Sequence, residues 1–135
     1  MTSVQTLPIT SEYDIITARQ AARELARQIG FNTVDQVRIA TAVSELTRNV
    51  VLYAGSGKVD IEAVAEEERQ GIVITVSDRG PGIADIELAL RDGYSTSNGL
   101  GAGLSGAKRL MDTFDIESRA GRGTTIRIGK WKHWK

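Results

Sequence analysis

Cysteine is absent from this 135-residue chain, which excludes disulfide bonds and thiolate chemistry and fits a reducing compartment. The one histidine, His133, lies in a polar tail, so a histidine-based zinc site is not expected. No apolar run approaches the roughly 18 residues of a membrane span, and the first residues lack the basic end and apolar core of a signal peptide. We therefore expect a cytoplasmic protein with no membrane partner.

An excess of charge of either sign is also absent. The 17 basic and 17 acidic residues cancel, and neither sign forms a long block. Binding to nucleic acid or to an anionic membrane relies on a basic surface, so neither partner is expected. Internal repeats and low-complexity stretches are lacking as well, and the length fits one domain, residues 1–135.

The hydrophobic pattern predicts helices and strands that segregate along the chain. Gly30 would end the first helix, Thr10 or Ser11 would cap its start, and Thr33 with Gln36 forms a capping box for the second helix. Helices are expected at about 13–29, 34–53, 86–91 and 101–111, and strands at 7–9, 58–66, 72–78, 114–118 and 124–128. The tail 130–135 reads as a frayed terminus or as a small contact surface with two tryptophans. This order favours an α+β two-layer sandwich, with helices on one face of a mixed, mostly antiparallel sheet.

Asp78 ends the apolar strand 72–78 and precedes a turn that contains Gly80 and Gly82. Because side chains alternate along a strand, Asp78 shares a face with the strand's core residues. A carboxylate there needs a hydrogen-bond donor, since an unsatisfied buried polar group costs about 1 to 3 kcal/mol. The exocyclic amine of adenine is such a donor, and the glycines would let the backbone approach the ring. The alternative is an ordinary turn after a strand.

Glu45 and Asn49 lie four residues apart on the second predicted helix, and therefore on one side of it. They flank the apolar stripe formed by Ile39, Val43, Leu46 and Val50, where a helix can border a pocket. A carboxylate there can accept a proton from an attacking hydroxyl, and an amide oxygen can bind Mg²⁺. The alternative is a solvated helix surface, because such pairs are common.

A glycine-rich segment, Gly99-Leu100-Gly101-Ala102-Gly103-Leu104, opens the next predicted helix. Free backbone N–H groups and the helix dipole would favour a phosphate there, whereas the alternative is a flexible loop with a close packing contact. A dinucleotide-binding loop needs a strand before the glycines, and a Walker A loop needs Gly-Lys followed by Ser or Thr; the segment has neither. No basic residue lies between Arg91 and Lys108, so strong metal dependence is predicted.

In this order, the segments 44–49, 78–82 and 99–103 resemble the N, G1 and G2 boxes of the GHKL ATPase/kinase superfamily. The segments 33–39, 52–55, 92–97 and 108–112 are further similar to the small serine/threonine switch kinases of the bacterial stressosome, relatives of the anti-sigma factor kinases. The resemblance implies the Bergerat-type ATP-binding fold and a protein serine/threonine kinase that uses ATP and Mg²⁺.

The resemblance also implies roles for individual residues. Glu45 would be the general base, Asn49 the Mg²⁺ ligand and Asp78 the partner of the adenine amine, with Thr124 supporting the adenine site through water. Further nucleotide-binding residues would shape the adenine pocket, form the lid over ATP or approach the phosphates: Gly80, Gly82, Ser95, Thr96, Gly99, Leu100, Gly101, Ala102, Gly103 and Leu104.

The implied partners are a STAS-domain antagonist, which is the substrate, and a PP2C-type phosphatase that the released kinase activates, within a large signalling complex. Two alternatives stay open at this point. One is an anti-sigma factor serine kinase, whose inhibited partner is a sigma factor. The other is a non-catalytic binding module in which ATP orders a lid and selects a partner.

Overall fold

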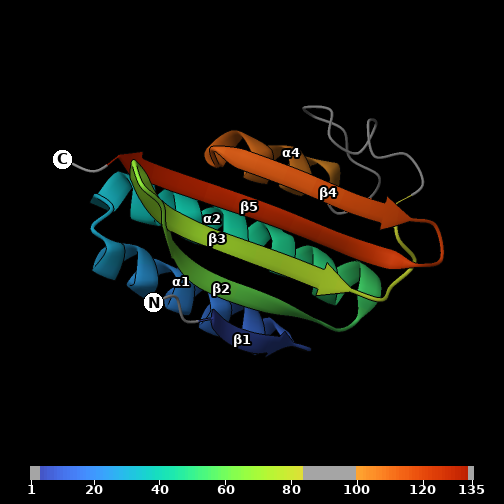
Figure 1. The fold of residues 1–135 in the computed structure, drawn as a ribbon. Helices are drawn as coiled ribbons and strands as arrows, with labels where there is room; N and C mark the ends of the chain where they lie inside the picture. Colours follow the sequence, from blue (N-terminus) through green and yellow to red (C-terminus); the bar gives the residue numbers. More distant parts are fainter. Residues whose placement is uncertain (1–3, 84–99, 134–135) are drawn as a thin grey trace.

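The computed structural model describes residues 4–83 and 100–133, and its strands form a single antiparallel sheet (Figure 1). The spatial order is β1-β2-β3-β5-β4, and every neighbouring pair is antiparallel. The strands are β1 (Val4–Ile9), β2 (Gly57–Ala65), β3 (Arg69–Asp78), β4 (Thr113–Arg119) and β5 (Gly123–His133). The predicted edge strand at 7–9 is confirmed and begins three residues earlier.

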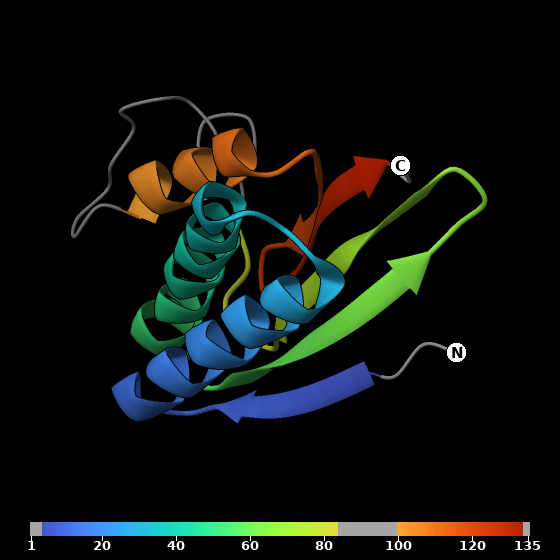
Figure 2. The same ribbon diagram turned by 90° about the vertical axis from the view of Figure 1, so that its left-hand side faces the viewer.

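The described helices cover one face of this sheet, as Figure 2 shows. They are α1 (Glu12–Ile29), α2 (Thr33–Asn49), the short π-helix η1 (Val50–Ala54) and α4 (Leu100–Leu110). The predicted two-layer α+β architecture is thereby confirmed, while the helix predicted at 86–91 lies outside the described residues. Of the helices in the described part of the chain, none has the length and apolar character needed to cross a bilayer.

The core lies between the helices and the sheet. The predicted stripe on α2, Ile39, Val43, Leu46 and Val50, is at most 3% exposed. It faces the inward residues of the two central strands, Ile72, Ile74, Val76, Ile126 and Ile128, all of them buried. The residues predicted to be buried from the 3.6-residue period of the helix and the two-residue period of the strands are therefore the ones in the core.

The helix ends agree with the predictions only in part. α1 begins after Ser11, whose side chain makes no capping hydrogen bond, contrary to the prediction that Thr10 or Ser11 would cap it. The helix stops at Gly30, whose φ of 106° is left-handed, as expected for a glycine after a helix. α2 is capped by Asn32 rather than Thr33: the Asn32 side chain accepts a hydrogen bond from the Asp35 N–H at 2.8 Å. Thr33 already has a helical backbone, and asparagine is at least as good a cap as threonine.

The prediction of a frayed tail is wrong for residues 130–133. β3 begins at Arg69, three residues before the predicted start, and β5 pairs with it up to His133. Backbone pairing on this longer β3 therefore orders the tail. Trp131 lies on the face away from the helices, with the Arg69 guanidinium 3.7 Å from its ring centroid. A stacked cation of this kind adds a favourable electrostatic contact to the strand pairing.

Candidate nucleotide-binding site

A mostly apolar cavity of about 120 Å³ lies between α2, η1, β3, α4 and β5. This volume is below the roughly 300 Å³ of pockets for drug-sized ligands, so the described residues enclose space for part of a nucleotide, such as the base. Four polar side chains, Asn49, Tyr53, Asp78 and Thr124, interrupt the apolar lining. The rest of the lining is Leu46, Val50, Ala54, Val76, Pro81, Gly82, Ile83, Leu104 and Ile126.

Asp78 reaches the cavity from the end of β3, on the buried face that strand alternation predicted. One carboxylate oxygen, Oδ1, accepts a hydrogen bond from the Gly80 N–H at 2.8 Å. Within residues 4–83 and 100–133, the other oxygen has no hydrogen-bond partner. The carboxylate therefore keeps one acceptor for a donor brought by a ligand.

Asn49 reaches the same cavity from the last residue of α2. Its Nδ2 is buried without a hydrogen-bond partner in the part of the chain that the structure describes. Buried polar groups are normally paired, because an unpaired one loses its water without compensation. An unpaired amide beside the half-paired Asp78 carboxylate marks a site that a polar ligand completes.

The π-helix η1 continues α2 past Asn49 and brings Tyr53 and Ala54 to the cavity. The π-helical turn is closed by a hydrogen bond from the Gly55 N–H to the Val50 carbonyl oxygen, five residues earlier, at 2.8 Å. Single π-turns of this kind are rare and are often found at functional sites. Hydrophobic periodicity predicted only a helix to residue 53 and assigned these two residues no role in the site.

Two glycines of the turn after β3 are required by close approach to other parts of the protein. A Cβ at Gly80 would lie 2.5 Å from the Ala54 Cβ, and one at Gly82 would overlap the Arg119 carbonyl oxygen. Gly82 also has a left-handed φ of 75°. The turn therefore packs closely against η1 on one side and the end of β4 on the other, beside the cavity.

Thr124 stands directly opposite Asp78 in the β3–β5 register and lines the cavity, whereas its neighbour Thr125 is exposed on the other face. The Thr124 hydroxyl lies 2.8 Å from the Ser118 hydroxyl on β4. Ser118 also accepts a hydrogen bond from the Ile83 N–H at 2.7 Å. Sequence reasoning missed Ser118, because only the strand order β3-β5-β4 places it beside this site.

Glu45 lies one turn before Asn49 on α2, but it is not among the residues that line the cavity. Its side chain is 35% exposed, and its carboxylate pairs with Arg48 at 3.1 Å. This half-buried position agrees with the predicted flank of the apolar stripe. A partner's hydroxyl can approach such a carboxylate from outside.

The glycine-rich segment is described only in part. Leu100, Gly101, Ala102 and Gly103 form the first turn of α4, and Leu104 is 1% exposed and lines the cavity. The predicted site residues Ser95, Thr96 and Gly99 lie outside the described residues. The structure thus brings Leu104 together with Asn49, Asp78, Gly82 and Thr124.

The described part of the chain contains no cluster of three or more His, Asp or Glu side chains that could hold a metal ion by themselves. The residues present nevertheless fit a magnesium nucleotide. Mg²⁺ prefers oxygen ligands and is usually held by one or two side chains together with phosphates and water. An amide oxygen at Asn49, beside a cavity with unpaired polar groups, meets that requirement.

Comparison with known proteins places this chain in a family. Residues 34–133 match the histidine kinase-, DNA gyrase B- and HSP90-like ATPases. The chain is 55% identical to the serine/threonine-protein kinase RsbT of Bacillus subtilis over 123 residues, which cover 91% of this chain and 92% of RsbT. It is 31% identical to the anti-sigma F factor of Thermoanaerobacter sp. over 118 residues, 84% of this chain and 82% of that protein.

Solved structures agree on the fold. The catalytic domain of the histidine kinase ThkA superposes with a TM-score of 0.57 at 17% identity, over 93% of this chain and 95% of that chain. The mycobacterial sensor histidine kinase MprB superposes with a TM-score of 0.55 at 16% identity, over 95% and 97%. The chain therefore belongs to the histidine kinase-, DNA gyrase B- and HSP90-like ATPase family, whose membership implies ATP binding, and within it to the RsbT-like serine/threonine kinases.

Proposed function

We propose that this protein uses Mg-ATP to phosphorylate a Ser or Thr hydroxyl of a STAS-domain antagonist and, once released from it, activates a PP2C-type phosphatase in a stress-signalling pathway. The observation that carries the catalytic part is the meeting of Asn49, Asp78 and Thr124 in one cavity beside Glu45. The 55% identity to RsbT supports the kinase class, and the partners follow from the resemblance to the stressosome switch kinases.

The base of the nucleotide would occupy the apolar cavity. The free oxygen of Asp78 would accept a hydrogen bond from the adenine amine, and Thr124 would support the same site through water. Gly80 and Gly82 would act by holding the turn close to η1 and β4, so that the carboxylate stays fixed. A fixed acceptor selects adenine because the amine is a donor at the position where guanine carries a carbonyl.

The phosphates would lie toward the first turn of α4. Backbone N–H groups of the glycine-rich segment, Gly99 to Leu104, would donate to phosphate oxygens, and Ser95 and Thr96 would belong to the lid over ATP. The Asn49 amide oxygen would hold Mg²⁺, which supplies charge neutralisation for phosphoryl transfer when bound. No basic residue lies between Arg91 and Lys108, so little else in this segment could neutralise that charge.

Glu45 would act as the general base. In the transfer, the acceptor hydroxyl oxygen bonds to the γ-phosphorus, the bond to the β–γ bridging oxygen breaks, and the hydroxyl proton passes to the Glu45 carboxylate. The carboxylate lies at the solvent border, where a protein substrate can deliver its hydroxyl. Arg48, at 3.1 Å, restricts the orientation of the Glu45 side chain until the substrate arrives.

An anti-sigma factor kinase is the second candidate, and similarity to anti-sigma F factors at 31% to 34% identity supports it. The identity of 55% to RsbT favours the first candidate. A non-catalytic binding module is disfavoured, because a pure binder needs no carboxylate one turn from a metal-binding amide.

Incubation of the purified protein with Mg-ATP and a STAS-domain protein from the same genome would test this proposal. Mass spectrometry should find one phosphate on a single Ser or Thr of the partner, absent with a Glu45→Ala variant and present with a Glu67→Ala control from the exposed β2–β3 turn. Transfer that persists in Glu45→Ala would reject Glu45 as the base. Binding of ATP without transfer would move the proposal to a sigma-factor partner or to the binding module.

A further inference from the structure

Lys130 occupies a position on β5 where the strand pattern calls for an apolar residue. It follows Ile126 and Ile128 on the helix-facing side of the sheet, and its side chain is only 11% exposed. Removing an ammonium group from water costs free energy unless it is paired and hydrogen-bonded. The sequence thus places a costly residue where an isoleucine would add stability, so a specific role is expected.

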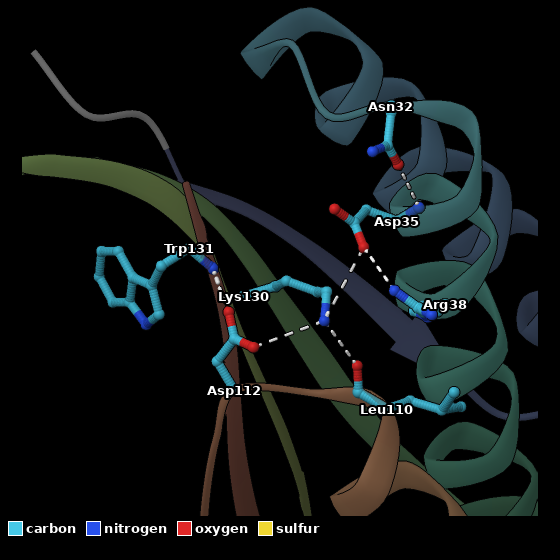
Figure 3. A network of polar contacts seen from close by, with 7 residues as sticks. All are labelled: Asn32, Asp35, Arg38, Leu110, Asp112, Lys130 and Trp131. Atoms are coloured by element: carbon cyan, nitrogen blue, oxygen red, sulfur yellow. Dashed lines mark hydrogen bonds and ion pairs between the residues drawn. The ribbon is translucent and has the colours of Figure 1, made fainter. Parts of the chain in front are cut away.

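The partners of Lys130 come from α4, from the turn that follows it and from α2 (Figure 3). Its Nζ donates a hydrogen bond to the Leu110 carbonyl oxygen at 3.0 Å and lies 3.5 Å from Asp112 Oδ1. Asp35 Oδ1 is 4.0 Å away and pairs with Arg38 at 3.1 Å. Two cations therefore meet two carboxylates, and the buried ammonium is compensated.

These contacts join two helix ends to one strand. Leu110 is the last residue of α4, so its carbonyl has no partner within the helix. Asp35 lies in the first turn of α2, and the Asp112 carboxylate accepts a hydrogen bond from the Trp131 N–H of β5 at 2.9 Å. A positive charge at a helix C-terminus also interacts favourably with the helix dipole. Lys130 thereby fixes the C-terminus of α4 relative to α2 and the sheet.

α4 depends on such a contact because its own sequence holds it weakly. Three of its 11 residues are glycine, each costing about 1 kcal/mol relative to alanine in a helix interior. Among the side chains described, Leu104, Ser105 and Ala107 are buried, Leu110 packs partly against the core, and Met111 is buried just beyond the end of the helix. The Lys130 contact at the C-terminus of α4 therefore helps to fix the position of the whole helix.

We propose that Lys130 is a positioning residue of the nucleotide site. It holds the C-terminus of α4, and this helix, about 16 Å long, carries Leu104 and the glycine-rich first turn to the cavity. The inference rests on the proposed role of that turn at the phosphates. Lys130 is not among the residues that line the cavity, so its effect on the nucleotide would pass through α4.

A Lys130→Met variant tests this inference through nucleotide affinity. Calorimetry with Mg-ADP, at a temperature where both proteins are fully folded by circular dichroism, should show a Kd about tenfold higher than that of the wild type, because small displacements of binding groups are costly. The matched control is Ile61→Val on β2, a buried change away from α4. It should lower the melting temperature and leave the Kd unchanged.

Rescue separates positioning from general destabilisation. Lys130→Arg keeps a charged donor for the Leu110 carbonyl and should recover most of the affinity. If Lys130→Met does not fold, Asp112→Asn, at a residue whose side chain is 46% exposed, should still raise the Kd about threefold, because it removes a charge 3.5 Å from the ammonium. A Kd within twofold of the wild type in Lys130→Met, or in Asp112→Asn where Lys130→Met does not fold, would overturn the inference. Failure of the wild-type protein to bind nucleotide would instead overturn the assignment of the cavity, and this inference with it.

Discussion

The two ends of helix α2 differ in how their polar groups are satisfied. At the N-terminal end, Asn32, Asp35 and Arg38 form hydrogen bonds or ion pairs, and the buried Lys130 joins them. At the C-terminal end, about 20 Å away at 1.5 Å per residue, Asn49 keeps a buried N–H group without a partner among the described residues.

This difference distinguishes polar side chains that hold the fold together from polar side chains that are available to a ligand. A paired cluster contributes to stability and to the placement of its elements, whereas an unpaired buried group loses free energy until a ligand supplies the partner. Substitutions at the paired end should therefore change stability first, except where they break the Lys130 contact to α4. Substitutions at the unpaired end should change nucleotide binding or catalysis first. The measurements on Glu45, Asp78 and Asn32 test this division, and those on Gly82 and Glu24 give reference values for parts outside the two ends.

The largest effect is expected for Glu45→Gln, one turn before Asn49 on α2. Loss of the base should slow phosphoryl transfer about 10²- to 10⁴-fold, because a positioned base contributes this much to proton transfer. Nucleotide affinity should stay unchanged, since Glu45 lies outside the cavity lining. The rate of phosphoryl transfer to the protein substrate would be measured under single-turnover conditions, with Glu67→Gln as a control. A rate within threefold of the wild type would contradict the assignment of Glu45 as the base.

Asp78→Asn should reduce ATP affinity about 10- to 100-fold, because it replaces an acceptor oxygen for the adenine amine with a donor or a neutral acceptor. The melting temperature should change little, as the Gly80 N–H can still donate to the amide oxygen. Calorimetry against Asp115→Asn, an exposed site on the outer face of β4, provides the comparison. Equal affinities in the two variants would remove Asp78 from the adenine site.

Gly82→Ala should lower the free energy of unfolding by about 2 kcal/mol, because the residue has a left-handed φ and its Cβ would overlap the Arg119 carbonyl oxygen. Gly121→Ala is the matched control: its φ is also left-handed, at 80°, but no atom lies within 4 Å of the added Cβ. Urea denaturation should therefore find the smaller loss in Gly121→Ala. Equal losses would mean that backbone strain alone, without the close contact, accounts for the requirement at Gly82.

Asn32→Ala, at the paired end, should cost about 1 kcal/mol of stability through loss of the cap on α2. ATP affinity should stay within twofold, since the Lys130 bond to Leu110 is retained. Thermal denaturation together with calorimetry tests both parts, with Asn32→Asp as the variant that keeps the cap. A large fall in affinity without a fall in stability would break the proposed division between the two ends.

The smallest effect belongs to α1, which contributes to neither end. Hydrogen bonds from Arg27 and Gln28 lower the pKa of Glu24 to about 2 from its ordinary 4.5. Because the folded pKa is depressed, the stabilisation is present above pH 4.5 and is lost as the pH falls toward 2. Glu24→Gln should slightly flatten the dependence of unfolding free energy on pH in that window, and an unchanged slope would show that the pair is screened at this exposed site.

The comparison also shows where sequence reasoning reached its limit. Local patterns located the core stripe of α2, the strand that ends in Asp78 and the left-handed stop at Gly30, because these follow from periodicity and backbone geometry. They placed the cap of α2 one residue late, since Asn32 and Thr33 are both capable caps. They also missed the extension of β5, because the partner that orders the tail lies some 60 residues away on β3.

By itself, the sequence determined the alternation that buries one face of each central strand, the helix period of α2 and the motifs that place the chain in its family. These are local or additive properties, and each can be read from a few neighbouring residues. Only the tertiary structure decided that Ser118 stands beside Thr124, that a π-turn brings Tyr53 to the cavity and that Lys130 joins α4 to α2. Such contacts depend on strand order and helix packing, which bring together residues distant in the chain and settle which polar groups are paired.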